Sequence, residues 1–457
     1  MPRQPSVTFL RGVNRMEIGK HLNKGMWGLA DKALPVVYGV GYVWLVIRVL
    51  PEEEFGNFVL VQEVFLIVSG LATAFALQPL LKFSSEDNAD ISGIVSAAFV
   101  LNVVFTIIAS LMVVALSTPA GMLLNSTSLG SLLLYVPAML LASLVRNFTM
   151  TLLQARFRIR EVFWMDAAHF LGAPFLVWIW SRMHMFDEAL DLVFINIISL
   201  TFSSIVGFWF VRGTVRFAVK PSHADFRKTW DFGKYSLGSV VSSLFSTKAD
   251  SFILSAFTGP VQVAVYNSAK IFVRLYEMAS QVVQMFVLPA ASRLSSQREQ
   301  ASLKALTEKA ILFLSIGLLP VTLLFLAFPA FLINLVYAGK YLEAVPILRV
   351  FSILTFVVPV TVVGSNVIMG LGDARRSFIL GVQLLAASLV SFLLFIPPFG
   401  AMGAAWGYVA ASALIAWLTA RALRDFVPIT PVEVFRRVSD IRGFIENHWF
   451  SLFQRRQ

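Results

Sequence analysis

The sequence contains no cysteine, and charged side chains are scarce. Only 14% of the 457 residues are charged, where a soluble protein carries roughly a quarter. This composition argues against a cytosolic globular enzyme. The lack of cysteine excludes disulfides, thiolate nucleophiles and cysteine metal sites, and the five histidines are too scattered to predict a zinc cluster. We therefore expect neither a metal site nor a catalytic centre.

The sequence also lacks an apolar core of signal-peptide length near its amino terminus. The first 24 residues carry several basic side chains instead. We therefore expect no cleaved segment here, and we expect the first membrane span to act as its own insertion signal.

Long hydrophobic runs dominate the rest of the chain, of which 57% is hydrophobic. A membrane-spanning helix needs about 20 apolar residues, and a helix satisfies its own backbone polar groups in lipid. The runs predict an all-α polytopic membrane protein with about twelve transmembrane helices in two six-helix lobes around a central cavity. The predicted spans are 25–49, 57–81, 91–117, 128–152, 162–181, 189–212, 230–257, 261–289, 306–336, 343–370, 375–397 and 400–422.

Nearly all basic residues outside these spans fall on the side of the amino terminus. The loops on the opposite side contain only Arg48, Arg182 and Lys340. The positive-inside rule therefore places both termini in the cytoplasm. The excess of 37 basic over 26 acidic residues, a net charge of +11, is then mostly topological, and we expect no nucleic-acid partner.

A basic segment divides the spans six and six. Gly19-Lys20 recurs as Gly233-Lys234 before the first span of each half, which favours a duplication into parallel repeats. In the tail, apolar residues at helical spacing alternate with charges, so the tail either docks on membrane lipids or stays solvated. The predicted parts are a cytoplasmic N-terminal segment (1–24), an N-lobe (25–212), a cytoplasmic linker (213–229), a C-lobe (230–424) and a cytoplasmic amphipathic tail (425–457).

The eighth span carries a polar stripe at helical spacing. Its members fall within a wedge of roughly 80° at about 100° per residue. They are Lys270, Arg274, Glu277, Gln281 and Gln284. Because ionisable side chains at bilayer depth are costly, the stripe predicts a polar or substrate-filled cavity. The alternative is a neutral Arg274–Glu277 pair that holds helices together.

Other basic residues lie within predicted spans. Lys248 and Asp250 on the seventh span form a second polar patch. Arg349, about two turns inside the tenth span, either lines the cavity or snorkels to the interface. We expect Arg146 and Lys234 to snorkel, because both lie near the cytoplasmic ends of their spans.

Acids and aromatic rings share a face of the first span. Asp31 aligns with Trp27, Tyr38 and Tyr42, whereas Lys32 points about 100° away. Ring faces stack on the apolar faces of sugars, so this face suits contact with a sugar or a lipid headgroup. The alternative is ordinary aromatic packing beside a snorkelling lysine.

Asp166 and His169 lie three residues apart on the fifth span. Histidine titrates near neutrality, so the two predict either a proton relay or a structural hydrogen bond. The candidate residues for coupling to a proton or sodium gradient are Asp31, Asp166, His169 and Asp250.

Several short stretches at span ends occur in a characteristic order. They are Leu50-Pro51-Glu52-Glu53-Glu54-Phe55-Gly56-Asn57-Phe58, Lys248-Ala249-Asp250, Gly259-Pro260, Val265-Tyr266, Pro289 with Ser292-Arg293-Leu294, Tyr341 to Arg349, Gly370-Leu371-Gly372-Asp373-Ala374-Arg375, Ile396-Pro397 and Phe399-Gly400-Ala401-Met402-Gly403-Ala404-Ala405. Over about residues 19–425 the chain resembles the polysaccharide (oligosaccharide-lipid) flippase family of the multidrug/oligosaccharidyl-lipid/polysaccharide exporter superfamily.

The resemblance implies a fold of two lobes around a cationic cavity, and it implies a transport function. That function is to turn an undecaprenyl-pyrophosphate-linked oligosaccharide from the cytoplasmic to the periplasmic leaflet of the bacterial inner membrane, for cell-surface polysaccharide. It implies a lipid-linked substrate, membrane lipids and a polysaccharide polymerase as partners. Basic residues at bilayer depth would neutralise the pyrophosphate. The candidates are Lys270, Arg274, Lys248, Lys32 and Arg349.

Two other functions fit this sequence less well. An ion-coupled drug or small-metabolite antiporter of the same superfamily should present acids and aromatic rings to its cavity, whereas the stripe holds two bases and one acid. A membrane glycosyltransferase or polymerase needs acids at the membrane surface, and the acidic cluster outside, Glu52 to Glu54, lies on a short hairpin. We therefore expect a transporter without enzymatic activity and without a bound cofactor.

Overall fold

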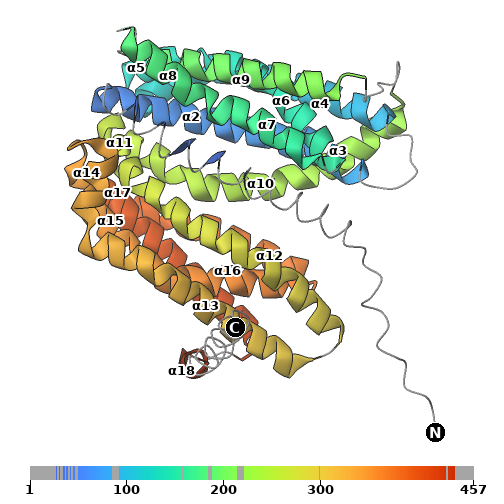
Figure 1. Cartoon of the computed structure of the whole chain (residues 1–457), viewed down its shortest axis with the longest axis vertical. Coiled ribbons are helices and arrows are strands. Elements are labelled where there is room, and N and C mark those ends of the chain that lie inside the picture. Colours follow the sequence, from blue (N-terminus) through green and yellow to red (C-terminus); the bar gives the residue numbers. More distant parts are fainter. Residues whose placement is uncertain are drawn as a thin grey trace, which may run out of the picture. The chain divides into compact units, whose positions relative to one another are not determined.

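The computed structural model describes residues 50–84, 92–156, 158–183, 188–213, 221–297, 299–428 and 431–437, with Trp27, Ala30, Leu34, Pro35, Tyr38, Gly39, Tyr42, Leu45 and Val46 before them. The regular structure of these residues is helical throughout (Figure 1). The predicted all-α class is therefore confirmed.

The helices follow one another with short connections. Their bounds are α2 (Glu52–Ala72), a π-helical turn η1 (Thr73–Leu77), α3 (Gln78–Phe83), α4 (Ser92–Leu123), α5 (Thr127–Leu133), α6 (Val136–Ala155), α7 (Ile159–Phe170), α8 (Gly172–Arg182), α9 (Ala189–Val211), α10 (His223–Thr258), α11 (Pro260–Lys270), a 3-10 turn η2 (Ile271–Val273), α12 (Arg274–Ser296), α13 (Gln300–Ala327), α14 (Pro329–Tyr337), a 3-10 turn η3 (Leu342–Ala344), α15 (Val345–Phe351), α16 (Leu354–Gly370), α17 (Ala374–Leu423) and α18 (Pro431–Arg436).

Within the described residues, eight helices are long and apolar enough to cross a membrane, or nine if the bent pair Leu342–Phe351 and Leu354–Gly370 is one span. The predicted number of twelve is not confirmed. The span 25–49 falls mostly outside the described residues. Helix α10 covers 230–257 but does not qualify as apolar, since it carries Lys234, Lys248 and Asp250. The last two predicted spans both lie in α17.

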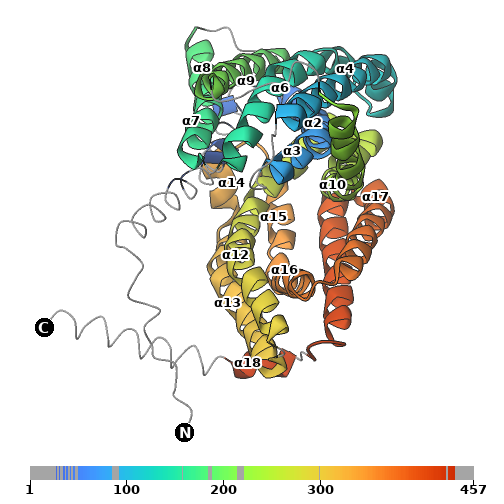
Figure 2. The ribbon, with the colours of Figure 1, turned by 90° about the vertical axis from the view of Figure 1, so that its right-hand side faces the viewer.

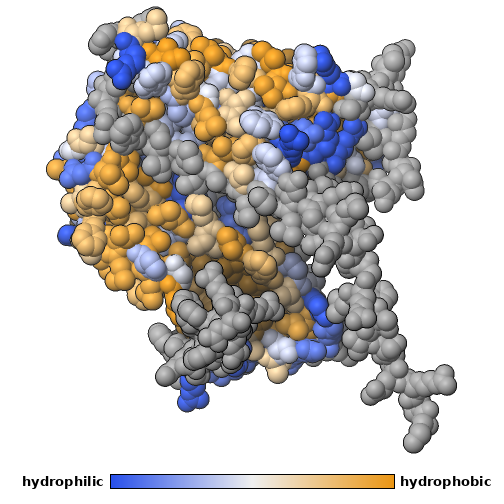
Figure 3. All heavy atoms as spheres, viewed as in Figure 1, coloured by the Kyte–Doolittle hydropathy of each residue, from blue (hydrophilic) through white to orange (hydrophobic). Residues whose placement is uncertain are grey.

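The chain forms two compact units. Unit 1 comprises 1–49, 64–116 and 132–237, and unit 2 comprises 50–63, 117–131 and 238–457. The lobe boundary at 213–229 stays a prediction. On the face shown in Figure 3, large apolar areas cover the described helices. Many of their large hydrophobic side chains are exposed, as expected of surfaces that contact lipid.

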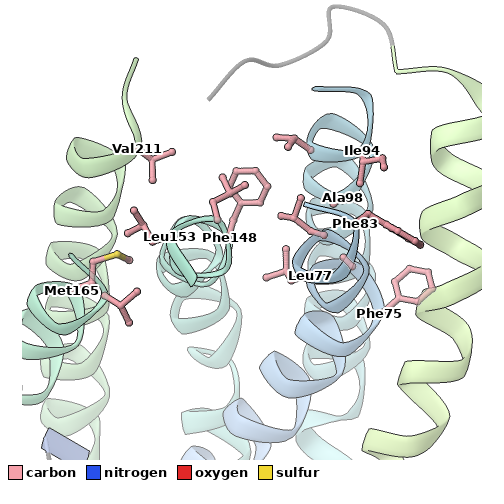
Figure 4. Packing of buried hydrophobic residues seen from close by; sticks show 14 residues of the cluster. Phe75, Leu77, Phe83, Ile94, Ala98, Phe148, Leu153, Met165 and Val211 are labelled. Carbon is pink, nitrogen blue, oxygen red and sulfur yellow. The ribbon is translucent and has the colours of Figure 1, made fainter. Parts of the chain in front are cut away.

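In unit 1, helix α9 packs closely on α6 and α7. Small residues at four-residue spacing make this possible, because Ser199, Ser203 and Gly207 are all buried on one face of α9. A Cβ atom at Gly207 would collide with Thr149 and Met165. Around this seam, apolar side chains from α3, α4, α6 and α9 form a core (Figure 4).

In unit 2, helix α12 packs against α13 and α16, and α16 packs against α17. Figure 2 shows α12 and α13 running side by side, and the views in Figures 1 and 2 agree on this. The core between these helices includes Val287, Ile311, Val367 and Leu423, with Val434 of α18 packed against it. One apolar cluster therefore joins α12, α13, α16 and α17.

Helix α17 reverses its direction at Gly400. This glycine has φ +54° and ψ −130° in the middle of the helix, a conformation that other residues rarely adopt. After the reversal, Gly403 lies against the backbone of Phe395, and Gly407 lies against Phe392. Because the later residue meets the earlier partner, the two arms are antiparallel, as two separate predicted spans, 375–397 and 400–422, require.

This hairpin provides a test of packing. Replacing Gly403 with alanine is expected to destabilise the protein by about 1–3 kcal/mol, because the new Cβ atom meets a backbone oxygen that cannot move aside. The matched change at Gly381, where a Cβ atom meets nothing within 4 Å, should be neutral or slightly stabilising. Thermal unfolding of both variants in detergent measures the difference. Equal melting temperatures would contradict the close packing.

Candidate functional site

Unit 2 contains a partly buried ion pair between α10 and α2. The Nζ atom of Lys248 lies 2.7 Å from Oε2 of Glu63 and donates a hydrogen bond to Oε1 at 2.8 Å. The lysine side chain is 24% exposed and that of the glutamate 9%. Within the described residues Glu63 has no second hydrogen-bond donor. The glutamate depends on this lysine for its neutralisation.

A second pair joins α10 and α11. The Nζ atom of Lys270 lies 2.5 Å from Oδ2 of the fully buried Asp250. The same oxygen accepts a hydrogen bond from the Tyr266 hydroxyl at 2.7 Å, and Oδ1 accepts one from the backbone N–H of Ser251 at 2.8 Å. Asp250 therefore keeps two donors even if Lys270 moves away. Lys270 also lies 5.9 Å from the Tyr408 ring, within cation–π range.

The predicted polar stripe is divided by a change in helix geometry. The 3-10 turn η2 separates Lys270, at the end of α11, from Arg274, at the start of α12. Lys270 turns back to α10, whereas Arg274, Glu277, Gln281 and Gln284 are exposed. Among the described residues neither Arg274 nor Glu277 forms an ion pair, so the alternative of a neutral pair between these two is not what the structure shows.

Two further residues were predicted to bind the anion, Arg349 and Lys32. Arg349 is exposed on α15, and the described part of the chain contains no ion partner for it. Lys32 and Asp31 fall outside the described residues. In unit 2 the groups without an ion partner are thus Arg274, Arg349 and Glu277 of the predicted set, two bases and one acid.

The aromatic residues of the first predicted span pack within unit 1. The rings of Tyr38 and Tyr42 stack with centroids 4.7 Å apart, and Asn196 donates a hydrogen bond to the Tyr42 hydroxyl at 3.2 Å. Trp27 meets the Phe163 ring edge to face at 5.0 Å. These contacts are those of ordinary aromatic packing, and Tyr42 is buried.

Unit 1 holds a buried ion pair between α6 and α7, formed by Arg146 and Asp166. Arg146 also donates from Nε to the Ser203 hydroxyl at 3.1 Å. The prediction that Arg146 snorkels is therefore wrong. Asp166 neutralises the guanidinium inside the protein, so the side chain does not need to reach the membrane interface.

Because Asp166 is paired with Arg146, His169 has a different hydrogen-bond partner. Asp166 faces Arg146, and Nδ1 of His169 lies 2.9 Å from the Ser199 hydroxyl on α9. No hydrogen bond joins Asp166 and His169 among the described residues. In this conformation the two form separate structural contacts. In the described part of the chain no three His, Asp or Glu side chains gather where they could hold a metal ion.

Residues 45–346, more than half of the chain, match the family described as polysaccharide biosynthesis protein. The chain belongs to this polysaccharide biosynthesis protein family. The flippase resemblance of its sequence motifs is thereby confirmed.

Two curated relatives match shorter segments. The chain is 29% identical over 182 residues to the uncharacterized membrane protein MJ1068 of Methanocaldococcus jannaschii, and 25% identical over 213 residues to Agl15, a probable low-salt glycan biosynthesis flippase of Haloferax volcanii. The matches cover 39% and 46% of this chain and 36% and 44% of those proteins. The matched segments thus span less than half of each relative.

Solved transporter structures share the fold. The lipid II flippase MurJ in an inward closed conformation matches with a TM-score of 0.73 at 14% identity, over 92% of this chain and 90% of that one. An inward-facing multidrug transporter of the MATE family matches with a TM-score of 0.65 at 13% identity, over 90% and 96%. At these identities the likeness shows the fold alone, that of the superfamily named by the motifs.

In this member of the polysaccharide biosynthesis family, the sequence did not indicate which basic residue pairs with Glu63. Glu63 is an isolated acid in the apolar run 57–81, a signal that it lies at bilayer depth. Its partner, Lys248, is 185 residues away in the sequence. Helical periodicity describes each helix alone, so it could not show that these two side chains meet.

Proposed function

We propose that this protein turns a lipid-linked oligosaccharide, with undecaprenyl pyrophosphate as the carrier, from the cytoplasmic to the periplasmic leaflet by alternating access. The observation that carries the proposal is the set of basic side chains in unit 2. Arg274 is exposed without an ion partner, one turn after Lys270. A pyrophosphate needs several such donors, because its charge must be neutralised at low dielectric.

The two lysine–carboxylate pairs fit this task. Without substrate, Glu63 neutralises Lys248 and Asp250 neutralises Lys270, so the lysines are not left as buried charges. We infer that the phosphate groups replace these carboxylates as partners of the lysines. Family membership and the flippase name of one curated relative support the same direction of reasoning.

We infer coupling to a proton gradient from the difference between the hydrogen bonds of the two acids. Asp250 keeps donors from Tyr266 and Ser251 when Lys270 leaves. Glu63 keeps none among the described residues, and a buried carboxylate without a donor binds a proton instead. We propose that Glu63 is protonated when Lys248 engages the substrate.

The antiporter alternative predicts a different arrangement. A site for cationic compounds should offer carboxylates that are free to pair with them. Here Glu63 and Asp250 are already neutralised by lysines. The acid of the predicted set without an ion partner among the described residues, Glu277, is outnumbered by two such bases, Arg274 and Arg349. We further propose that the protein lies in the bacterial inner membrane with both termini in the cytoplasm, as the distribution of basic residues predicts.

A deletion strain tests the function. Cells without the protein should accumulate undecaprenyl-pyrophosphate-linked glycan in the cytoplasmic leaflet, and wild-type protein should clear it. We expect Arg274→Gln to clear it at least ~10-fold more slowly, because a charge-assisted hydrogen bond to phosphate is lost. Arg274→Lys, which keeps the charge, is the matched control and should retain most of the activity.

The readout is glycan extracted from cells in which each variant is expressed at the wild-type level. No accumulation in the deletion strain, together with altered sensitivity to cationic compounds, would replace this proposal by the antiporter.

A further inference from the structure

Unit 2 contains an apolar groove of about 360 Å³ outside the site described above. Its lining comes from α13, with Leu312, Ser315 and Leu319, from the start of α16, with Thr355 and Phe356, and from α17 and α18. In Figure 1 helices α13 and α16 lie together with α18. Leu319 and Phe356 are exposed, so the groove opens to the surroundings of the helices.

Both hydroxyl groups that line the groove already donate their hydrogen bonds within the protein. The Ser315 hydroxyl donates to the backbone oxygen of Ile311 at 2.8 Å, and the Thr355 hydroxyl donates to the Tyr276 hydroxyl at 3.1 Å. A water molecule needs two to four polar partners to fill a cavity. Because α13 meets the length and composition of a membrane span, its surroundings are hydrocarbon. The groove therefore suits a hydrocarbon chain.

Helix α18 borders the groove at the end marked by Val434. Arg437, just after α18, donates to Oε2 of the buried Glu308 at 2.8 Å, and Lys304 donates to Oε1 of Glu433 at 2.6 Å. Val434 lies between these two contacts and lines the groove. Charged side chains mark the edge of the hydrocarbon region, so this end lies at the level of the lipid headgroups.

The length of the groove corresponds to one leaflet. From Ile311 to Leu319 helix α13 rises about 12 Å, somewhat less than half of a hydrocarbon core of about 30 Å. A chain that enters at the headgroup level would thus fill the groove down to the middle of the bilayer. This is the depth reached by an acyl chain of a phospholipid.

The charge beside the groove indicates the headgroup. Arg424 is exposed and lies four residues after the lining residue Ala420, so the two share a helix face. The described residues hold no ion partner for Arg424. We propose that the groove binds one acyl chain of an anionic phospholipid, with the headgroup phosphate against Arg424. This site is separate from the basic site of the proposed function.

The test measures phospholipid retained by the purified full-length protein, by native mass spectrometry with phosphatidylglycerol, phosphatidylcholine or undecaprenyl phosphate added. We expect wild type to retain phosphatidylglycerol about fivefold more than phosphatidylcholine, and Arg424→Gln to lose this preference, because one basic residue near a membrane surface contributes about that factor. Arg227→Gln, an exposed charge in unit 1, is the control and should keep the preference.

Filling the groove should remove the lipid. Ser315→Phe places a ring inside it, and we expect retention of phosphatidylglycerol to fall about tenfold. Gly317→Phe adds the same ring two residues away, where a Cβ atom meets nothing within 4 Å, and should retain lipid as wild type does.

Equal retention in the two phenylalanine variants would overturn the site. Stronger retention of undecaprenyl phosphate than of phosphatidylglycerol would overturn the phospholipid as occupant. If Ser315→Phe fails to fold, the Arg424→Gln variant still tests the proposal, because an exposed side chain can be replaced without unfolding the protein. A preference for phosphatidylglycerol that survives this substitution would overturn the proposal.

Discussion

Replacing Asp166 with asparagine is expected to lower the stability of unit 1 by about 3–5 kcal/mol. The substitution keeps the shape of the side chain but removes its charge, so Arg146 is left as a buried cation without its carboxylate. The side chains of the two residues are only 11% and 6% exposed, so water cannot replace the lost partner. Unfolding of the purified protein in detergent measures the loss.

Two controls separate the ion pair from general damage. The double variant Arg146→Met with Asp166→Leu should recover most of the stability, because apolar side chains of similar volume can replace a buried pair. Breaking the exposed pair of Arg227 and Asp231, whose atoms lie 3.7 Å apart, should cost less than about 1 kcal/mol. Additive losses in the double variant would show that the pair is not the cause. We expect the recovered double variant to transport normally as well, since the contacts of Arg146 and Asp166 are those of a link between α6 and α7. A loss of transport in it would instead support a coupling role for Asp166.

The helices of this protein could be predicted from its sequence because each apolar run carries its own signal. The run 91–117 became α4, Ser92–Leu123, and the run 189–212 became α9, Ala189–Val211. In both, few charged residues interrupt the apolar stretch, and lipid leaves the backbone no alternative to a helix. The reversal between 397 and 400 was also predictable, since two prolines precede a glycine there.

The partners of the buried charges could not be predicted. Arg146 pairs with Asp166 and Lys248 with Glu63 across different helices, and the period of one helix carries no information about another. The stripe on the eighth span was divided for a local reason, since the 3-10 turn η2 changes the angle between Lys270 and Arg274. The contacts of the tail could not be predicted for the same reason, since Glu433 and Arg437 pair with side chains of α13. Residues 438–457 of the predicted tail lie outside the described part.

The Arg146–Asp166 pair and the Lys248–Glu63 pair differ in how their side chains are held in place. Arg146 has a further hydrogen bond to Ser203, and Asp166 lies at the seam of three helices, so the pair is bound into the core of unit 1. Lys248 is 24% exposed and reaches Glu63 from a neighbouring helix. A lysine on a flexible stem, with part of its surface accessible, can exchange one anionic partner for another. The contacts of the first pair are those of a structural link, whereas the second, like the pair of Lys270 and Asp250, leaves its lysine able to exchange partners during transport.

Replacing Lys248 with methionine is expected to cost about 3–5 kcal/mol of stability and to abolish glycan transport. Glu63 is then a buried carboxylate without a donor, which destabilises the fold. The double variant Lys248→Met with Glu63→Leu removes both charges, so its stability should return close to that of wild type. Its transport should stay at least ~10-fold below wild type, because the cation that meets the phosphate is still missing.

This separation of stability from transport is what distinguishes a binding lysine from a structural one. The control is the double variant of Arg146 and Asp166, which should recover both properties. Unfolding in detergent and clearance of lipid-linked glycan in the deletion strain are measured on the same preparations of each variant. If the double variant of Lys248 and Glu63 clears glycan as wild type does, this pair only joins α10 to α2, and the substrate phosphate must be neutralised by Lys270 and Arg274 instead.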